Sequence, residues 1–254
     1  MPLPRVAIHG RGKVGRALAR ALRAGGVEVR LRSGRSAKVS EGELVILAIP
    51  DGAIAEAATR IASRCARAKP VAVAHCAGAL GASVLDELAR AGVPVAQMHP
   101  LVSFASTKAR MPAGAFVLVQ GTKRAVTTIV RVIRAAGLEP LRGPVEPTLY
   151  HAAAAMVANG AVALGAAGRR LLIEAGVSDA RIERALGALL ESVAQNVAAL
   201  GVDAALTGPV KRGDRETVEE HRRALATTAP DLLQLHAELV ALQSALARKT
   251  TRSR

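Results

Sequence analysis

The sequence predicts an α/β fold in which a doubly wound, mostly parallel sheet is followed by an all-helical C-terminal part. From Arg5 to Gly143, short aliphatic runs alternate with longer stretches of helical spacing. Most of these runs are continuous apolar blocks, which is typical of strands buried on both faces of a parallel sheet. After Pro147 no further strand-like run occurs. We therefore expect a sheet domain over residues 1–146 and a helical substrate or dimerisation domain over residues 147–254.

Seven strands and four helices are expected in the first domain. The strands are predicted at Val6–His9, Val27–Leu31, Leu44–Ile49, Val71–His75, Val93–Gln97, Phe116–Gln120 and Leu138–Leu141. The helices are predicted at 13–24, 53–67, 81–91 and 123–136. Gly25, Gly92 and Gly137 stand where helices of this kind end, because glycine accepts the backbone conformation of a helix C-terminus.

The second domain is expected to contain four helices. The first two cover residues 148–175 and 179–200, with Ser178 as the expected N-cap of the latter. A loop is predicted from Ala204 to Gly213, and helices follow at 214–227 and 231–248.

Composition excludes several classes of protein. The formal charge of +15 invites a nucleic-acid role, but only 1% of the residues are aromatic, so stacking platforms are nearly absent. Nowhere in the sequence do 18 apolar residues follow one another without a charge, so we expect no membrane span. The apolar stretch before the first glycine turn is too short for a signal peptide. With only Cys65 and Cys76, a reduced cytoplasmic location is expected, and no metal site.

A glycine-rich turn is the strongest motif. Gly10, Gly12 and Gly15 satisfy G-x-G-x-x-G between a predicted strand and a predicted helix, a context that favours dinucleotide binding. The pyrophosphate is expected at the helix N-terminus, where free N–H groups and the helix dipole favour anions. A purely structural glycine turn is the alternative. The expected cofactor-binding residues are Gly10, Arg11, Gly12, Lys13, Val14, Gly15, Arg32, Ser33, Arg35, Ile49, Pro50 and Ala77.

The end of the second strand favours NADP over NAD. NAD enzymes usually carry an acidic residue there, about 20 residues after the fingerprint. This chain has Arg32, Ser33 and Arg35 instead, which offer donors to an adenosine 2′-phosphate. Solvation of one or more of these arginines is the alternative. NAD is less favoured as the cofactor, and a deazaflavin is left open.

Four residues are candidates for work on the substrate. His99 follows a predicted strand beside Pro100, and an unperturbed His titrates near neutrality, which suits an acid or base. His151 and Asn159 stand two turns apart on the first C-terminal helix and can face one cleft. Arg212 precedes Gly213 and suits a substrate carboxylate. The alternatives are a His that satisfies backbone groups, an Asn bonded within the core, and a loop in which Asp214 merely caps the next helix.

Several segments together resemble a bacterial family described as a Rossmann-like domain joined to domain of unknown function 2520. The resemblance is carried by the glycine turn, AIPDGAI, HCAGALGASVL, HPLVSF and LTGPVKRGDRETVEEHRRAL. That family is similar to pyrroline-5-carboxylate reductase, ketopantoate reductase, prephenate dehydrogenase and the β-hydroxyacid dehydrogenases. These relatives imply NAD(P)-dependent hydride transfer, a helical C-terminal domain and frequent dimerisation through it. Ala77 stands where the family often has Ser, and Ala155 stands four residues before Asn159 where β-hydroxyacid enzymes use Lys.

The sequence thus predicts an NADP-dependent oxidoreductase acting on a small C=O or C=N substrate, one that carries a carboxylate. A catalytically silent NADP-binding sensor or scaffold is the alternative, and a basic nucleic-acid binder is less favoured. A homodimer through the C-terminal helices is also expected, because residues 152–168 are apolar beyond what one helical layer buries.

Overall fold

The computed structural model describes residues 2–252, with side-chain surroundings up to residue 249. Its contacts divide the chain into two compact units, Met1–Met156 and Val157–Arg254. The first holds the whole sheet and the second only helices, so the predicted fold class is confirmed. The domain boundary expected at residue 147 coincides with the first residue of helix α5 and stays a prediction.

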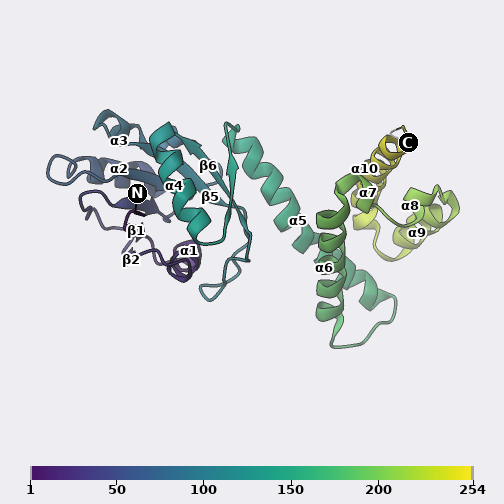
Figure 1. Ribbon diagram of the computed structural model, residues 1–254. Coiled ribbons are helices and arrows are strands. Elements are labelled where there is room, and N and C mark those ends of the chain that lie inside the picture. The colour runs from purple at the N-terminus through teal and green to yellow at the C-terminus, as the bar shows by residue number, and fades with distance from the viewer. Residues whose placement is uncertain (1, 253–254) are drawn as a thin grey trace. The chain divides into compact units, whose positions relative to one another are not determined.

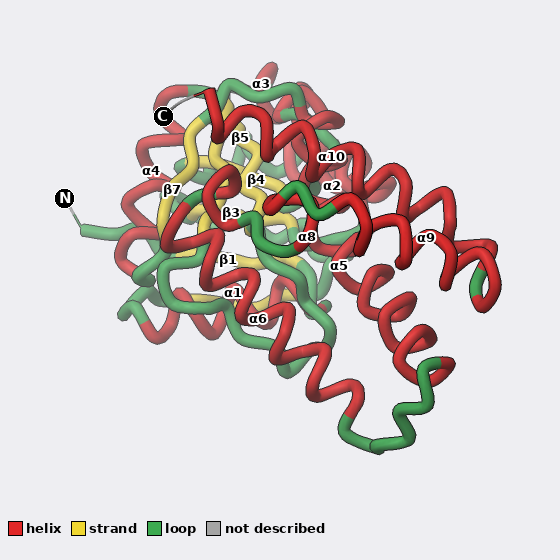
Figure 2. The backbone as a smooth tube through the Cα atoms, turned by 90° about the vertical axis from the view of Figure 1, so that its right-hand side faces the viewer, coloured by secondary structure: helices red, strands yellow, loops and turns green. Residues whose placement is uncertain are grey.

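One seven-stranded sheet forms the first unit, with strand order β2-β1-β3-β4-β5-β6-β7 (Figure 2). The strands are β1 (Val6–His9), β2 (Val29–Arg32), β3 (Leu44–Leu47), β4 (Ala72–His75), β5 (Val95–Pro100), β6 (Phe116–Gly121) and β7 (Glu139–Arg142). All neighbouring pairs are parallel except β5 and β6, which are antiparallel. Strands β1 to β5 therefore end at the same edge, where ligands of open parallel sheets bind.

Helices cover both faces of this sheet, and each face has its own core (Figure 1). The helical elements are α1 (Lys13–Ala24), η1 (Asp51–Ala53), α2 (Ile54–Ala62), η2 (Ala82–Leu85), α3 (Asp86–Arg90) and α4 (Lys123–Ala135). Alternate strand residues such as Ile8 and Ile46 pack with α1 and α4, whereas Ala7 and Val45 pack with α2 and α3. The period-2 pattern of a strand buried on both sides explains this division. The helix predicted over 53–67 ends earlier, at Ala62.

The second unit is built from helices. They are α5 (Pro147–Glu174, shared with the first unit), α6 (Ile182–Leu200), α7 (Val202–Ala205), α8 (Pro209–Arg212), α9 (Arg215–Thr228), η3 (Pro230–Leu232) and α10 (Leu233–Arg252). Two expectations were wrong. Ser178 is not an N-cap, because α6 begins after Arg181, and the predicted loop over 204–213 contains the last residues of α7 and all of α8.

Helix α5 differs from the expectation that no segment is apolar enough to span a membrane. Within the described residues it is the one helix that meets the length and hydropathy of a span, and none of that stretch is buried. One such helix is weak evidence of a membrane protein, because helices that pack on a protein partner have the same composition.

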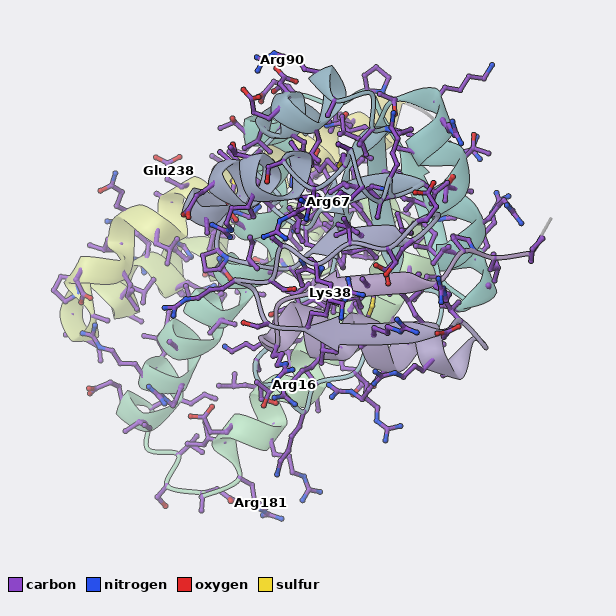
Figure 3. The ribbon with its side chains drawn as sticks, turned by 90° about the vertical axis from the view of Figure 1, so that its left-hand side faces the viewer. Arg16, Lys38, Arg67, Arg90, Arg181 and Glu238 are labelled. Atoms are coloured by element: carbon purple, nitrogen blue, oxygen red, sulfur yellow. The ribbon has the colours of Figure 1, made fainter. Side chains whose placement is uncertain are left out.

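Charged side chains cover much of the first unit (Figure 3). Arg16, Lys38, Arg67 and Arg90 are exposed and come from four different segments. The positive charge is therefore spread over separate segments of the chain.

Candidate functional site

The glycine turn after β1 is shaped by close backbone packing. Gly10 has φ +126°, and a Cβ there would overlap the carbonyl oxygen of Ala48. A Cβ on Gly15 would overlap the carbonyl oxygen of Gly10. Gly12 is different, because no described atom lies within 4 Å of where its Cβ would be. Gly10 and Gly15 are thus required by the fold, whereas the space beside Gly12 is open to a ligand.

This turn fits a dinucleotide pyrophosphate. Gly12 is the N-cap of α1 and has no side chain with which to cap the first-turn N–H groups. These groups and the positive end of the helix dipole therefore face the open space beside Gly12. Arg11 and Lys13 are exposed on either side of it, and Val14 is half-buried. The chemistry and the shape of the turn both suit a doubly charged anion.

One hollow of about 680 Å³ gathers four of the expected cofactor residues. Ser33, Arg35, Ile49 and Pro50 all line it. Arg60 of α2 also lines this hollow and forms an ion pair with Glu56. The hollow lies between the loop after β2 and the loop after β3, where the adenosine half of a dinucleotide binds in folds of this kind.

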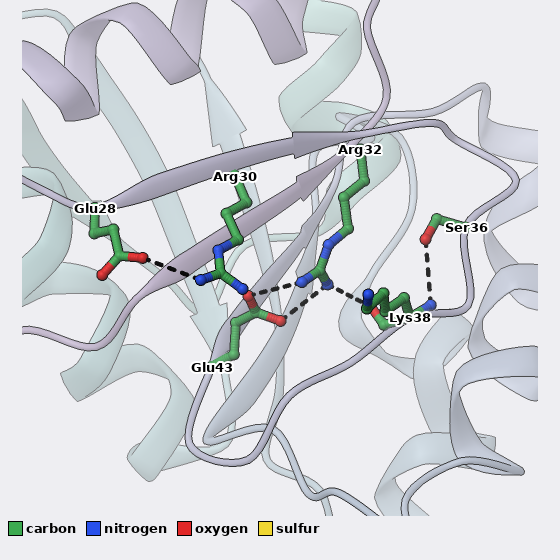
Figure 4. A network of polar contacts seen from close by, with 6 residues as sticks. All are labelled: Glu28, Arg30, Arg32, Ser36, Lys38 and Glu43. Carbon is green, nitrogen blue, oxygen red and sulfur yellow. Dashed lines mark hydrogen bonds and ion pairs between the residues drawn. The ribbon is translucent and has the colours of Figure 1, made fainter.

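Arg32 differs from the expectation of a free guanidinium. Its Nη atoms donate to both carboxylate oxygens of Glu43, at 2.9 and 3.1 Å (Figure 4). It also donates to the carbonyl oxygen of Lys38. The Glu43 side chain is fully buried and that of Arg32 is 12% exposed. Arg32 therefore neutralises a buried carboxylate, and its predicted contact with an adenosine phosphate would compete with that ion pair.

His99 lies at the end of β5, within a cluster of rings. Its Nδ1 is 3.0 Å from the Tyr150 hydroxyl, and its ring meets that of His151 edge to face, with centroids 5.9 Å apart. A Cβ on Gly78 would overlap Nδ1 of His151 and lie 3.0 Å from Nε2 of His99. His99 Nε2 and His151 Nδ1 thus converge on the bare backbone of Gly78, just beyond β4.

The His99 imidazole is neutral at physiological pH. Burial lowers its pKa to about 4, and the nearby His151 adds to this effect. The expectation of an unperturbed His therefore does not hold. A neutral imidazole can still polarise a carbonyl or imine by donating one N–H.

His75 and two glutamines hold the backbone beside His99. His75 contacts the carbonyl oxygen of Gly81 through Nε2 and accepts from the N–H of Ala77 through Nδ1, so both ring nitrogens are used structurally. Buried Gln97 donates to the carbonyl oxygens of Ala77 and Gly78. Gln120 then joins two segments, because it donates to Gln97 and accepts from the N–H of Val145.

The remaining candidates lie in the second unit. Asn159 is exposed on α5, and Arg212 is exposed at the end of α8. Asp214 caps α9, since it accepts from the backbone N–H of Thr217 at 3.1 Å and from its hydroxyl at 2.8 Å. These bonds lower the pKa of Asp214. The structure thus brings His99 and His151 together, and it describes Asn159 and Arg212 within a separate unit.

Sequence reasoning missed Tyr150, Gln97 and Gln120. Tyr150 is the one tyrosine of the chain and stands beside His151, and that adjacency was the available signal. The glutamines interrupt otherwise apolar strands, where a buried amide needs partners of its own.

Comparison with known families identifies the chain. The model of the domain of unknown function DUF2520 matches residues 115–243, and a Rossmann-like domain model matches residues 35–100. The chain belongs to the DUF2520 family. The resemblance noted from the sequence is thereby confirmed. A search of curated proteins gave no match for this DUF2520 chain.

Solved structures share this fold over nearly the whole chain. A Thermotoga maritima protein, TM1727, is 24% identical, with a TM-score of 0.75 over 97% of this chain and 99% of its own. A proposed NADP oxidoreductase from Bacteroides fragilis is 18% identical, with a TM-score of 0.70 over 96% and 98%. The pyrroline carboxylate reductase of Plasmodium falciparum, solved with NADP bound, is 12% identical, with a TM-score of 0.58 over 96% and 98%. At these sequence identities, the comparison shows that the fold is shared and nothing further.

Proposed function

We propose that this DUF2520 protein is an NADP-dependent oxidoreductase that transfers hydride between NADPH and a small C=O or C=N compound, one that carries a carboxylate. One observation supports this most. The glycine turn after β1 and His99 at the end of β5 open on the same edge of one sheet. A cofactor that lies along this edge extends from the turn toward Gly78. The folds of the Bacteroides and Plasmodium structures agree with that arrangement.

The chemistry would be divided between cofactor and chain. A bound nicotinamide dinucleotide supplies or accepts the hydride. The first-turn N–H groups of α1 bind its pyrophosphate, and the open backbone at Gly12 allows close approach. Neutral His99 donates its Nε2–H to the heteroatom of the substrate and polarises the double bond. His151 borders the same space, and Asn159 and Arg212 remain our candidates for holding the substrate.

Preference for NADP rests on Ser33 and Arg35, because Arg32 is engaged by Glu43. Loss of a charged hydrogen bond to a phosphate costs about 1.5–3 kcal/mol, or roughly 10- to 100-fold in affinity. We therefore expect Arg35→Ala to weaken NADPH binding at least tenfold and NADH binding less than threefold. Arg90→Ala on α3, an exposed arginine outside this hollow, is the matched control. An unchanged ratio of the two affinities in Arg35→Ala would remove the preference.

Turnover can be tested directly. NADPH consumption is measured by its absorbance with a panel of keto acids and cyclic imines. We expect consumption by the native chain, and a loss of 100-fold or more in His99→Gln with NADPH binding retained. A panel compound turned over equally well by His99→Gln would refute the role of His99.

A silent NADP-binding sensor is the second candidate. It is favoured by the low pKa of His99, which burial produces, and by Ala77, which offers no hydroxyl. NADPH binding without consumption of any compound in the panel would support this alternative.

A homodimer through the C-terminal helices is part of the proposal. Apolar side chains on α5 and α6 are widely exposed, including Val157 (76%), Val162 (72%) and Leu189 (60%). Exposed apolar surface on this scale is typical of an interface between chains. Light scattering should give twice the mass of one chain, and a monomer would contradict the proposal. We also propose a cytoplasmic location, to which the free thiols of Cys65 and Cys76 are suited.

A further inference from the structure

Among the described residues, Tyr150 is the side chain that forms a hydrogen bond with a ring nitrogen of His99. The hydroxyl and Nδ1 are 3.0 Å apart, and the two rings are perpendicular with centroids at 5.5 Å. Tyr150 belongs to the first turns of α5, whereas His99 ends β5, so the contact joins residues 51 positions apart. It therefore depends on the tertiary fold and holds the ring of His99 through Nδ1, whereas Nε2 is the ring nitrogen near Gly78.

The two nitrogens of His99 face different surroundings. Nδ1 faces the phenol, and Nε2 faces the backbone of Gly78. A neutral imidazole carries one proton, so the contact with Tyr150 decides which nitrogen donates. If the phenol donates to Nδ1, the N–H is on Nε2. If Nδ1 donates to the phenol oxygen, Nε2 has only a lone pair and cannot polarise a carbonyl or imine.

The phenol is suited to be the donor. Burial raises the pKa of Tyr150, so its hydroxyl keeps its proton at physiological pH. Among the hydrogen bonds of the described residues, His99 Nδ1 is the partner of this hydroxyl. The Tyr150 side chain is half-buried.

We propose that Tyr150 is a positioning residue that donates its hydroxyl proton to Nδ1 of His99 and thereby fixes the Nε2–H tautomer toward the substrate. This inference rests on the proposed function and adds a proton path to it. As the hydride adds to the carbon of a C=O group, the Nε2–H bond of His99 breaks and an O–H bond forms on the substrate. The Tyr150 proton moves to Nδ1, so the imidazole stays neutral. After the product leaves, Nδ1 returns this proton to the phenolate and Nε2 takes a proton from solvent, which restores the starting state.

The tautomer can be measured without any substrate. Nitrogen-15 NMR of labelled imidazoles distinguishes a protonated ring nitrogen from an unprotonated one, and His99→Gln assigns the signal. We expect Nε2 to be protonated and Nδ1 unprotonated in the native chain, and Tyr150→Phe to show a mixture of the two tautomers. Leu149→Ala is the matched control, because Leu149 precedes Tyr150 and its side chain is 72% exposed. A protonated Nδ1 in the native chain, or an unchanged tautomer in Tyr150→Phe, would overturn the proposal.

Kinetics provide the second readout. In Tyr150→Phe we expect kcat to fall 10- to 100-fold while KM and the Kd of NADPH change less than threefold. A change in KM alone, or an unaltered kcat, would contradict the proton path. If the native chain consumes no substrate, the proposed function fails, yet the NMR result still decides whether Tyr150 sets the tautomer of His99.

Discussion

The ion pair between Arg32 and Glu43 leads to a prediction that separates structural from cofactor roles. The Glu43 carboxylate is fully buried, and Arg32 holds both of its oxygens. Removing one partner of a buried ion pair leaves an uncompensated charge and costs about 3–5 kcal/mol. Replacing both partners by apolar residues of similar volume is often neutral. We therefore expect Arg32→Met to lower the free energy of unfolding by about 3–5 kcal/mol, and the double variant Arg32→Met/Glu43→Leu to recover most of it.

Urea unfolding followed by far-UV circular dichroism measures this effect, because the chain has no Trp and one Tyr for fluorescence. The same variants are then titrated with NADPH and NADH. We expect the double variant to keep its relative affinity for NADPH within threefold, since Arg32 is engaged by Glu43. A destabilisation of Arg32→Met below about 1 kcal/mol, the range of exposed ion pairs, would refute the structural reasoning. A tenfold loss of NADPH affinity in the stable double variant would instead indicate that Arg32 binds the adenosine phosphate.

Three further predictions concern the turn, the buried His and the glutamine contacts. Gly10→Ala should lower the free energy of unfolding by at least about 2 kcal/mol through backbone strain and overlap, whereas Gly12→Ala should leave urea unfolding unchanged. Burial lowers the pKa of His9 to about 4, so between pH 6.5 and 4 the unfolded chain binds more protons than the folded one. The free energy of unfolding should therefore decrease by up to about 3 kcal/mol as the pH is lowered from 6.5 to 4. His9→Gln should flatten this dependence in urea titrations, and an identical slope would contradict it. Gln120→Leu removes the partner of the Val145 N–H, so the exchange of that amide should accelerate, and unchanged protection would count against the contact.

The sheet was predictable because its inner strands are buried on both faces. β1, β3 and β4 are buried throughout, so each reads as an unbroken apolar run in the sequence. The antiparallel pairing of β5 and β6 was harder to foresee, since it depends on how the chain returns to the sheet. The connection between Pro100 and Phe116 contains no helix, and parallel neighbours usually need one.

The candidate site was predictable in part. The fingerprint glycines follow from local spacing, and the closeness of their backbones to Ala48 explains why glycine is needed. The contact between His99 and Tyr150 and the pairing of Arg32 with Glu43 depend on side chains that meet only in the folded chain. The pKa of His99 likewise depends on burial, which its sequence neighbours do not reveal.

The most direct test of the central claim is an equilibrium titration of the chain with NADPH and with NADH, followed by the fluorescence of the dihydronicotinamide. The account predicts saturable binding of both, tighter for NADPH, and a tenfold or larger loss of NADPH affinity when Gly12→Glu places a carboxylate at the N-terminus of α1. Absence of saturable binding, or equal affinity of the native chain and Gly12→Glu, would contradict it.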